Sequence, residues 1–273
     1  MNRIKAIVKI AWIEALESII SIKGLAVFLM MLFFVNLELE PVATQAMIYK
    51  CKVGWAILPY LHTKVIYTLI FAFSVLYYYS EVPFLSDYSN YQLLRVGRKQ
   101  WVAIKFMRIF FGAFLLMLME AFVSILVIFP NVDFSNRWGA FWNTFSLEQG
   151  IDLSFPRNIV ILYTPVTATL RVFWVGCFII FLMGMLEFTI TLFLDNKYAV
   201  IICGLLACGP VLAANSEYAN IYYISPVAWI GIVEHSLAYH YTGPRMPYMC
   251  VVLLFIIVVL SVITKQRVKS MNL

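Results

Sequence analysis

The sequence predicts an all-α membrane protein with about six transmembrane helices, folded as a single transmembrane domain over residues 1–273. Composition is the first reason: 63% of the residues are hydrophobic, 12% are charged, and the mean hydropathy is +0.88. Run length is the second, because a helix needs about 20 mostly apolar residues to cross roughly 30 Å of hydrocarbon while satisfying its own backbone hydrogen bonds. These two observations exclude a soluble domain of this length.

Six apolar runs are long enough to be considered as spans. We place them at residues 24–43, 61–82, 102–129, 166–194, 198–214 and 247–264. The first is expected to be short or partly re-entrant, because its uninterrupted apolar core ends at Val35 and polar residues follow at Asn36, Glu38 and Glu40. The fourth and fifth must be joined by a tight hairpin at residues 194–197.

Lysine and arginine set the expected orientation, since short cytoplasmic loops carry the excess of these residues. If both termini are cytoplasmic, 13 of the 20 lysines and arginines lie inside and seven lie outside. The net charge of +6 then reflects topology, and it gives no reason to propose a nucleic-acid partner. The chain has no N-x-S/T glycosylation signal, which fits a multi-pass protein of a bacterial plasma membrane.

Residues 1–23 predict an amphipathic helix lying in the inner membrane interface rather than a cleaved signal peptide. The residues expected on its apolar face are Ile4, Val8, Ala11, Ala15, Ile19 and Ile22. Lysines beside this face would attract anionic membrane lipids. The alternative is that these residues simply begin a longer first helix, which crosses the membrane from Lys23 onward.

The motifs of catalysis and metal binding are missing from the chain. It contains no GxxxxGK[ST] phosphate loop and no HExxH, and its five cysteines form no CxxC pair. His235 and His240 are five residues apart in an expected outer loop, a weak arrangement for a metal site. We therefore expect no catalytic residue, no metal and no cofactor in this chain.

Three charged residues fall within the expected spans and are candidates for lining or gating a pathway: Glu120, Arg171 and Glu187. Arg171 and Glu187 would be about 24 Å apart on one helix, so they cannot pair with each other. For Glu120 three roles stay open, namely lining or gating a pathway, a structural hydrogen bond between helices, and proton coupling.

Residues 84–100 form a polar and then basic connector between the second and third spans. Helical spacing predicts a short amphipathic helix carrying Tyr88, Tyr91, Gln92 and Arg95, with Asp87 or Ser86 as its N-cap and Gly97 at its end. Beyond it, Arg98, Lys99, Trp101 and Lys105 are expected to anchor the entrance of the third span at the lipid headgroups.

The connector sequence LLRVGRKQWVAIK, together with the order of spans, resembles the permease subunits of type-2 ABC exporters, a family that includes bacterial antimicrobial-peptide immunity and export permeases. The resemblance implies that the connector is a coupling helix on which a separate ABC ATPase subunit docks. The contacts it implies are Asp87, Tyr88, Tyr91, Gln92 and Arg95. It also implies ATP and Mg²⁺ on that partner, and a second permease copy or a diverged sibling that completes a dimer.

The same family places short re-entrant helices between its last two spans, and residues 215–245 fit that layout. This implies Pro226 and Trp229 as outer-gate candidates. The alternative is an outer loop that lies on the interface without a gating role.

The loop of residues 130–165 carries the aromatic residues Trp138, Phe141, Trp142, Phe145 and Phe155. We expect them to rest on the outer headgroups, the alternative being recognition of an amphipathic substrate.

The leading functional hypothesis is a permease subunit that exports a hydrophobic or amphipathic substrate, such as a peptide, lipid or drug, with no ATPase activity of its own. Two alternatives remain. One is an energy-independent membrane scaffold or sensor subunit, and the other is a small secondary transporter driven through Glu120 and Glu187.

Overall fold

A computed structural model describes residues 2–81, 95–147, 155–216, 220–232 and 243–270. In order, its elements are α1 (Asn2–Ile20), α2 (Ile22–Ile48), β1 (Val53–Gly54), α3 (Leu58–Leu61), α4 (Val65–Tyr79), α6 (Arg98–Ile128), β2 (Val132–Asp133), α7 (Gly139–Phe145), α8 (Arg157–Leu162), α9 (Pro165–Thr191), α10 (Asn196–Ala207), α11 (Gly209–Ala214), α12 (Ile221–Ile224), η1 (Pro226–Ile230) and α13 (Met246–Ser270). Within the described residues, 5 helical segments are long and apolar enough to span a membrane, and α4 is a shorter apolar helix. The chain is an all-α, multi-pass membrane protein.

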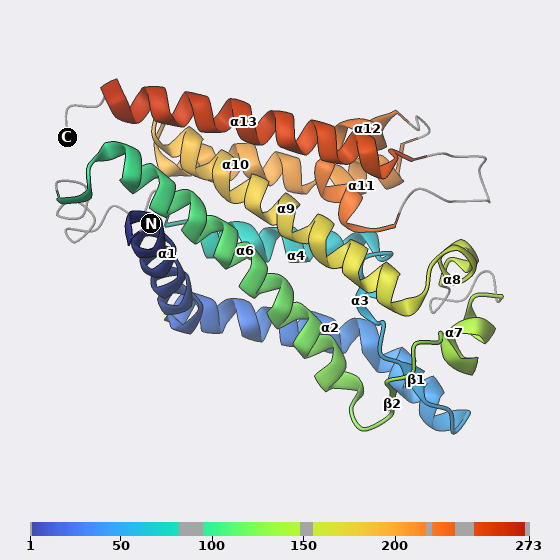
Figure 1. Cartoon of the computed structure of the whole chain (residues 1–273). Helices are drawn as coiled ribbons and strands as arrows, with labels where there is room; N and C mark the ends of the chain where they lie inside the picture. Colours follow the sequence, from blue (N-terminus) through green and yellow to red (C-terminus); the bar gives the residue numbers. More distant parts are fainter. Residues whose placement is uncertain (1, 82–94, 148–154, 217–219, 233–242, 271–273) are drawn as a thin grey trace.

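Consecutive long helices run in opposite directions through the bundle (Figure 1). Each helix therefore ends at the same end of the bundle as that at which the next one starts. Four contacts join these ends: Lys23 Nζ to Glu81 Oε1 at 3.1 Å, Asn196 Nδ2 to the carbonyl of Ser80, Arg267 Nε to the carbonyl of Leu192 at 3.0 Å, and Arg98 Nη1 to the carbonyl of Lys269 at 2.8 Å. The starts of α2, α6 and α10 therefore lie with the ends of α4, α9 and α13. We call this the terminal end, because both chain termini are there, and the opposite end the cap end.

Two expected spans differ in length from the structure. The first is not short, because α2 is one continuous helix of 27 residues that accommodates Pro41. The second is shorter than expected: α4 has 15 residues, and a turn over residues 62–64 separates it from α3. The other four expected spans lie at the expected positions, although Cys208 divides the fifth into α10 and α11 just before Pro210. The fourth and fifth are joined by the expected tight hairpin, at residues 192–195.

Helix α1 lies across the axes of the long helices at the terminal end (Figure 1). It is separate from α2, because the Ser21 hydroxyl accepts a hydrogen bond from the Gly24 amide and caps α2. A side chain at Gly24 would come within 1.9 Å of the Ile19 carbonyl oxygen, so glycine is needed at this turn. A single longer helix is thus the wrong alternative.

Only part of the expected apolar face of α1 contacts the bundle. Ala11 and Ala15 are fully buried against α6, because small side chains let the two helices approach closely. Ile4 and Ile22 are 71% and 88% exposed. The exposed isoleucines are thus available to lipid, while the alanines hold the helix to the protein.

The outer-loop aromatics form a small core at the cap end, which corrects the expectation that they rest on the outer headgroups. Trp142 is fully buried, with its ring 5.1 Å from that of Tyr60 and 5.2 Å from that of Phe155. Its indole N–H donates to the carbonyl of Gly54 in β1, which pairs in parallel with β2. Trp138, Phe141 and Phe145 are buried too. These rings pack against one another instead of facing outward, because the 50–61 segment supplies an apolar surface that sequence analysis did not identify.

Candidate functional site

Four buried polar side chains, His62, Tyr67, Thr68 and Glu120, form a cluster inside the bundle, which we call the Glu120 cluster. Tyr67 donates its hydroxyl proton to Glu120 Oε1 at 2.7 Å, and His62 Nε2 lies 3.0 Å from the same oxygen. The imidazole contact has ion-pair distance without hydrogen-bond alignment, and Glu120 Oε2 has no hydrogen-bond partner among the described residues. The side chains of His62 and Glu120 are 0% exposed.

Three structural elements bring the cluster together. His62 ends α3, Tyr67 and Thr68 lie in the first turn of α4, and Glu120 lies on α6. The imidazole Nδ1 lies 3.4 Å from the hydroxyl oxygen of Thr68, so the ring is held on both sides. Glu120 is eight residues, or about 12 Å, from the cap end of α6.

Segment η1 covers the cluster from the cap end. A side chain at Gly231 would come within 2.6 Å of the carbonyl oxygen of His62, so the backbone after η1 lies directly on the end of α3. Pro226 and Trp229 of η1 are buried, and the indole N–H of Trp229 donates to the carbonyl of Tyr222 at 2.5 Å. The structure therefore places both expected gate residues in a packed cap above the cluster.

Carboxylate, imidazole and phenol are the side chains that most readily exchange protons in proteins. A lone ionised carboxylate buried away from water is strongly disfavoured unless it is paired. The contacts with Tyr67 and His62 therefore pair the Glu120 carboxylate within the cluster. Of the three roles open from the sequence, a contact between helices is present.

Glu187 is equally buried but has a different environment. Its side chain on α9 is 0% exposed, and neither carboxylate oxygen has a hydrogen-bond partner among the described residues. Arg171, on the same helix, stacks on the ring of Tyr163 at 5.3 Å and donates to its hydroxyl at the cap end. The three charged residues expected to line one pathway thus lie in three separate places.

The expected headgroup anchors divide into exposed and buried residues. Arg98 and Lys99 are exposed at the start of α6. Trp101 is only 1% exposed and packs on the ring of Phe188, and Lys105 is 2% exposed. These last two therefore lie inside the protein instead of at headgroups, because α1 and α9 cover their side of α6.

A buried ion pair fixes α1 to α6. Lys105 Nζ lies 2.9 Å from Glu14 Oε2, and Arg108 Nη1 lies 3.4 Å from the same oxygen. Glu14 sits one residue before buried Ala15, so the carboxylate faces the interface between the helices. Lys105 therefore serves as a contact between helices.

Most of the expected coupling helix lies outside the described residues, including Asp87, Tyr88, Tyr91 and Gln92. His235 and His240 lie outside them as well. Arg95 is described: it is exposed and helical together with Val96. Gly97 follows with φ of 87°, a conformation that favours glycine, and separates this turn from α6 as expected.

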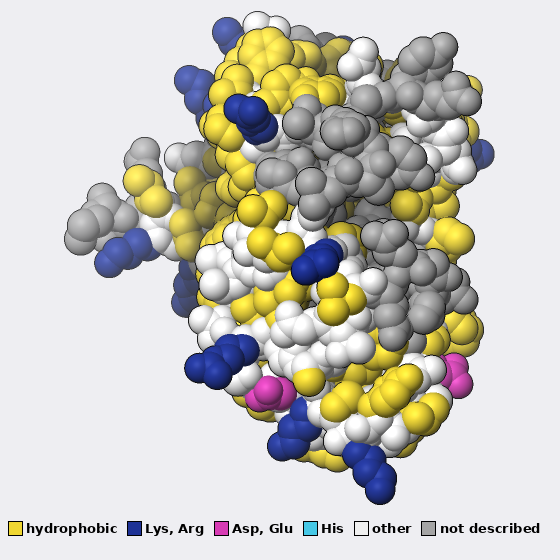
Figure 2. Space-filling model, turned by 90° about the vertical axis from the view of Figure 1, so that its right-hand side faces the viewer, with side chains coloured by type: hydrophobic (Ala, Val, Ile, Leu, Met, Phe, Trp, Pro, Cys, Tyr) yellow, Lys and Arg dark blue, Asp and Glu magenta, His cyan; other side chains and the backbone are white. Residues whose placement is uncertain are grey.

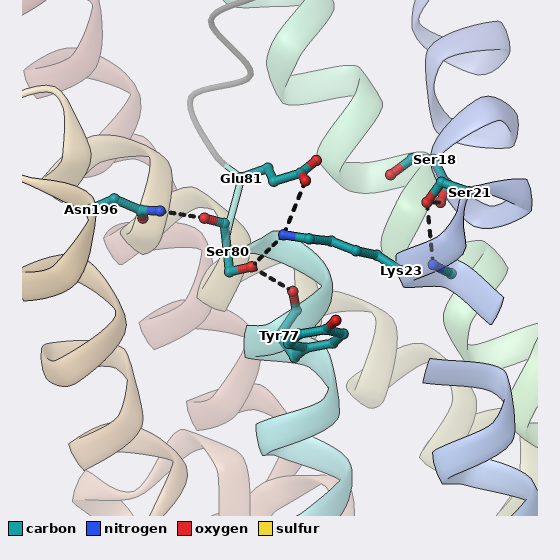
Figure 3. A network of polar contacts seen from close by, with 8 residues as sticks. Ser18, Ser21, Lys23, Tyr77, Ser80, Glu81 and Asn196 are labelled. Atoms are coloured by element: carbon teal, nitrogen blue, oxygen red, sulfur yellow. Dashed lines mark hydrogen bonds and ion pairs between the residues drawn. The ribbon is translucent and has the colours of Figure 1, made fainter. Parts of the chain in front are cut away.

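A polar network surrounds the point where the connector leaves α4, and Figure 3 shows it. Lys23, at the start of α2, lies 2.9 Å from Ser80 Oγ and 3.1 Å from Glu81 Oε1. Asn196, at the start of α10, donates to the carbonyl of Ser80. The root of the connector is thus attached to two other helices.

The cap end shows dispersed charge over its described surface (Figure 2). Lysine and arginine side chains stand apart from one another among hydrophobic and neutral side chains. Asp133 accepts hydrogen bonds from the amide and hydroxyl of Ser135, which hold the pKa of its carboxyl below the ordinary value. On the described part of this face, charged side chains are therefore dispersed and not clustered.

Sequence reasoning missed His62, Tyr67 and Glu14. The spacing of Tyr67 and Thr68 from His62 carried no known motif, and Glu120 is 58 residues from His62. A glutamate buried in a span requires a partner. The signal in the sequence was therefore the presence of donor side chains, such as His62 and Tyr67, near the end of a neighbouring span. Comparisons with protein-family models, with curated proteins and with solved structures found no match to this chain.

Proposed function

We propose that this chain is the membrane-spanning permease subunit of an ATP-driven ABC transporter, which exports a hydrophobic or amphipathic substrate across a bacterial plasma membrane. The order and placement of the helices support the proposal most directly. Helix α1 lies across the terminal end, the connector joins α4 to α6 at that same end, and short helices interrupt the chain between α10 and α13. This is the layout that the resemblance to type-2 exporters implies.

The division of labour in this proposal follows from what the chain lacks and from where the connector is attached. ATP and Mg²⁺ bind a separate ATPase subunit that docks on the connector. Closure of two ATPase subunits then moves the connectors of two permease chains. The contacts of Lys23 and Asn196 with the residues at the connector's root pass that movement to α2 and α10.

Co-purification tests the proposal. The chain is purified in mild detergent from its native host, and the associated proteins are identified for the wild type and for Tyr91→Ala with Arg95→Glu. We expect an ATP-binding subunit with the wild type and at least a tenfold loss of it in the double variant. Tyr49→Ala with Arg137→Glu is the matched control, because these exposed residues make the same chemical change near the cap end.

The control is expected to retain the ATPase subunit. If a folded wild-type chain brings down no ATP-binding protein, the proposal is wrong. Equal loss in both double variants would also count against the connector as the docking site.

A small secondary transporter is the second candidate, and the complete burial of Glu120 and Glu187 favours it. Intramembrane carboxylates are typical of proton-coupled transport. Uptake or efflux in proteoliposomes that follows a pH gradient without ATP, and that Glu120→Gln abolishes, would support this candidate over the first.

A further inference from the structure

We propose that a groove between α2 and α4 binds a phospholipid, with an acyl chain in the groove and the ammonium of its headgroup on the carboxylate of Glu38. This inference does not rest on the exporter proposal. It rests on three observations: the groove is apolar and open to the outside of the bundle, a carboxylate lies at its end, and that carboxylate lies at the level of lipid headgroups.

The groove lies between two apolar helices of the bundle. Its lining includes Met30, Met31 and Phe34 from α2 and Tyr67, Ile70 and Ser74 from α4. Met30, Phe34 and Ile70 are partly exposed, so the groove is open along its outer side. The lining carries no charge, and the Ser74 hydroxyl donates to the carbonyl of Ile70 within its own helix. Such a surface suits an alkyl chain, because the chain needs no hydrogen-bond partner.

Two aromatic rings give the groove a fixed wall on α4. The rings of Tyr67 and Phe71 lie within 16° of parallel, with their centroids 6.5 Å apart. Behind this wall, the hydroxyl of Tyr67 donates to Glu120 Oε1 at 2.7 Å, which holds the ring in place. A wall that is already ordered lets a chain bind without the cost of ordering side chains.

Glu38 lies at the cap end of the groove. Met30, Phe34 and Glu38 follow one another at intervals of four residues, so they lie along one face of α2. The charge of Glu38 acts on Tyr67, which lines the groove, and that of Lys64, just before α4, acts on Glu38. The Glu38 side chain is partly exposed and makes no hydrogen bond or ion pair among the described residues. An ammonium in a lipid headgroup would supply that partner.

The level of Glu38 along the bundle matches that of lipid headgroups. Helix α4 has 15 residues and is about 22 Å long, whereas the hydrocarbon is roughly 30 Å thick. Charged residues lie close to both of its ends, Lys64 at the cap end and Glu81 at the terminal end. On α2, Phe33 is 62% exposed, and further toward the cap end Glu40 is exposed as well. The outside of α2 therefore changes from apolar to polar near Glu38.

Charge decides which headgroup fits this site. The ammonium of phosphatidylethanolamine can donate hydrogen bonds to the Glu38 carboxylate, and its phosphate has the charge opposite to that of Lys64. Phosphatidylglycerol has the phosphate but no cation, so Glu38 repels its headgroup. We therefore expect the site to prefer phosphatidylethanolamine.

Native mass spectrometry with added lipid tests the proposal. The purified chain is titrated in detergent at neutral pH with phosphatidylethanolamine and with phosphatidylglycerol that carry identical acyl chains. We expect the wild type to bind phosphatidylethanolamine at least about tenfold more tightly, since a hydrogen-bonded charge pair takes the place of a repulsion. Glu38→Gln should remove most of this preference. Glu40→Gln is the matched control and should keep it, because Glu40 is exposed on the opposite side of α2.

Ser74→Leu tests the groove independently of the headgroup. The added side chain would occupy the groove, so binding of both lipids should weaken severalfold. Ser261→Leu on α13 is its control, because Ser261 also donates to the carbonyl four residues earlier, that of Ile257. If Ser74→Leu does not fold, Glu38→Gln still tests the proposal, since it changes a partly exposed side chain.

Three results would overturn the proposal. The first is equal affinity of the wild type for the two lipids, or a preference that persists in Glu38→Gln. The second is binding of both lipids that a folded Ser74→Leu leaves unchanged. The third is saturable binding of dodecylamine without binding of phosphatidylethanolamine, which would assign the site to a soluble cationic amphipath instead of a membrane lipid.

Discussion

At the scale of single residues, two buried carboxylates, Glu120 and Glu187, have opposite environments. Glu120 has Tyr67 and His62 within 3.0 Å of one oxygen, whereas neither oxygen of Glu187 has a hydrogen-bond partner among the described residues. A buried polar group without a partner costs free energy, but removing one member of a group in contact leaves the other members without it. The same substitution should therefore have opposite effects at the two positions.

We predict that Glu187→Met raises the free energy of unfolding by about 1–3 kcal/mol, because methionine has a similar volume and needs no partner. Glu120→Met should lower it by about 2–4 kcal/mol, since it leaves His62 and Tyr67 without the carboxylate. Reversible SDS unfolding at pH 6 measures both. Destabilisation by Glu187→Met would show that this carboxylate has a favourable partner in the membrane.

At the scale of elements, α1 is held by a combination of close packing and one buried charge contact. Ala11 and Ala15 bring α1 close to α6, and Glu14 then lies within ion-pair distance of Lys105 and Arg108. An amphipathic helix that only rested on lipid would need no such contact. We therefore regard α1 as a part of the bundle.

A double-mutant cycle measures this attachment. Lys105→Met should lower the free energy of unfolding by about 2–3 kcal/mol, because Glu14 loses its nearer partner in a partly buried site. Adding Glu14→Gln should recover about 1–2 kcal/mol of that loss, so the two changes are not additive. Lys99→Met, at an exposed position of the same helix, should have little effect. Strict additivity would show that the pair contributes nothing to the docking of α1.

At the scale of the whole molecule, the five helices long enough to span a membrane and the shorter α4 place both termini at one end of the bundle and the core of outer-loop aromatics at the other. Much of the outside of the bundle is apolar: Val251, Leu254 and Phe255 of α13 are 66%, 58% and 67% exposed. Such a surface is stable when hydrocarbon surrounds it. We propose, from the distribution of lysine and arginine, that the terminal end faces the cytoplasm.

Cysteine labelling in intact cells tests this orientation. In a background where Cys51, Cys208 and Cys250 are serine, Lys52→Cys and Arg137→Cys should react with a membrane-impermeant maleimide. Lys269→Cys, at the terminal end, should react only after permeabilisation. The reverse pattern would mean that the chain is inserted the other way.

Much of the helical framework could be predicted, because a span in hydrocarbon must satisfy its backbone within one continuous apolar segment. The ends of α4 could not, since the turn at 62–64 depends on contacts of α3 with α6 and α9. Within the candidate site, Glu120 and Glu187 were identified as unusual by their position in spans. Their environments were not predicted, because the partners come from distant segments.

The sequence by itself determined that this protein lies in a membrane, the order of its apolar segments, and the bias of basic residues toward one end. These properties follow from local composition, because the free energy of transferring a segment from water to hydrocarbon depends mainly on the residues of that segment. Only the tertiary structure decided that Trp142 and its aromatic neighbours form a cap core, that Lys105 pairs with Glu14, and that His62 contacts Glu120. Such contacts depend on which helix faces meet, and packing between segments far apart in the chain decides that.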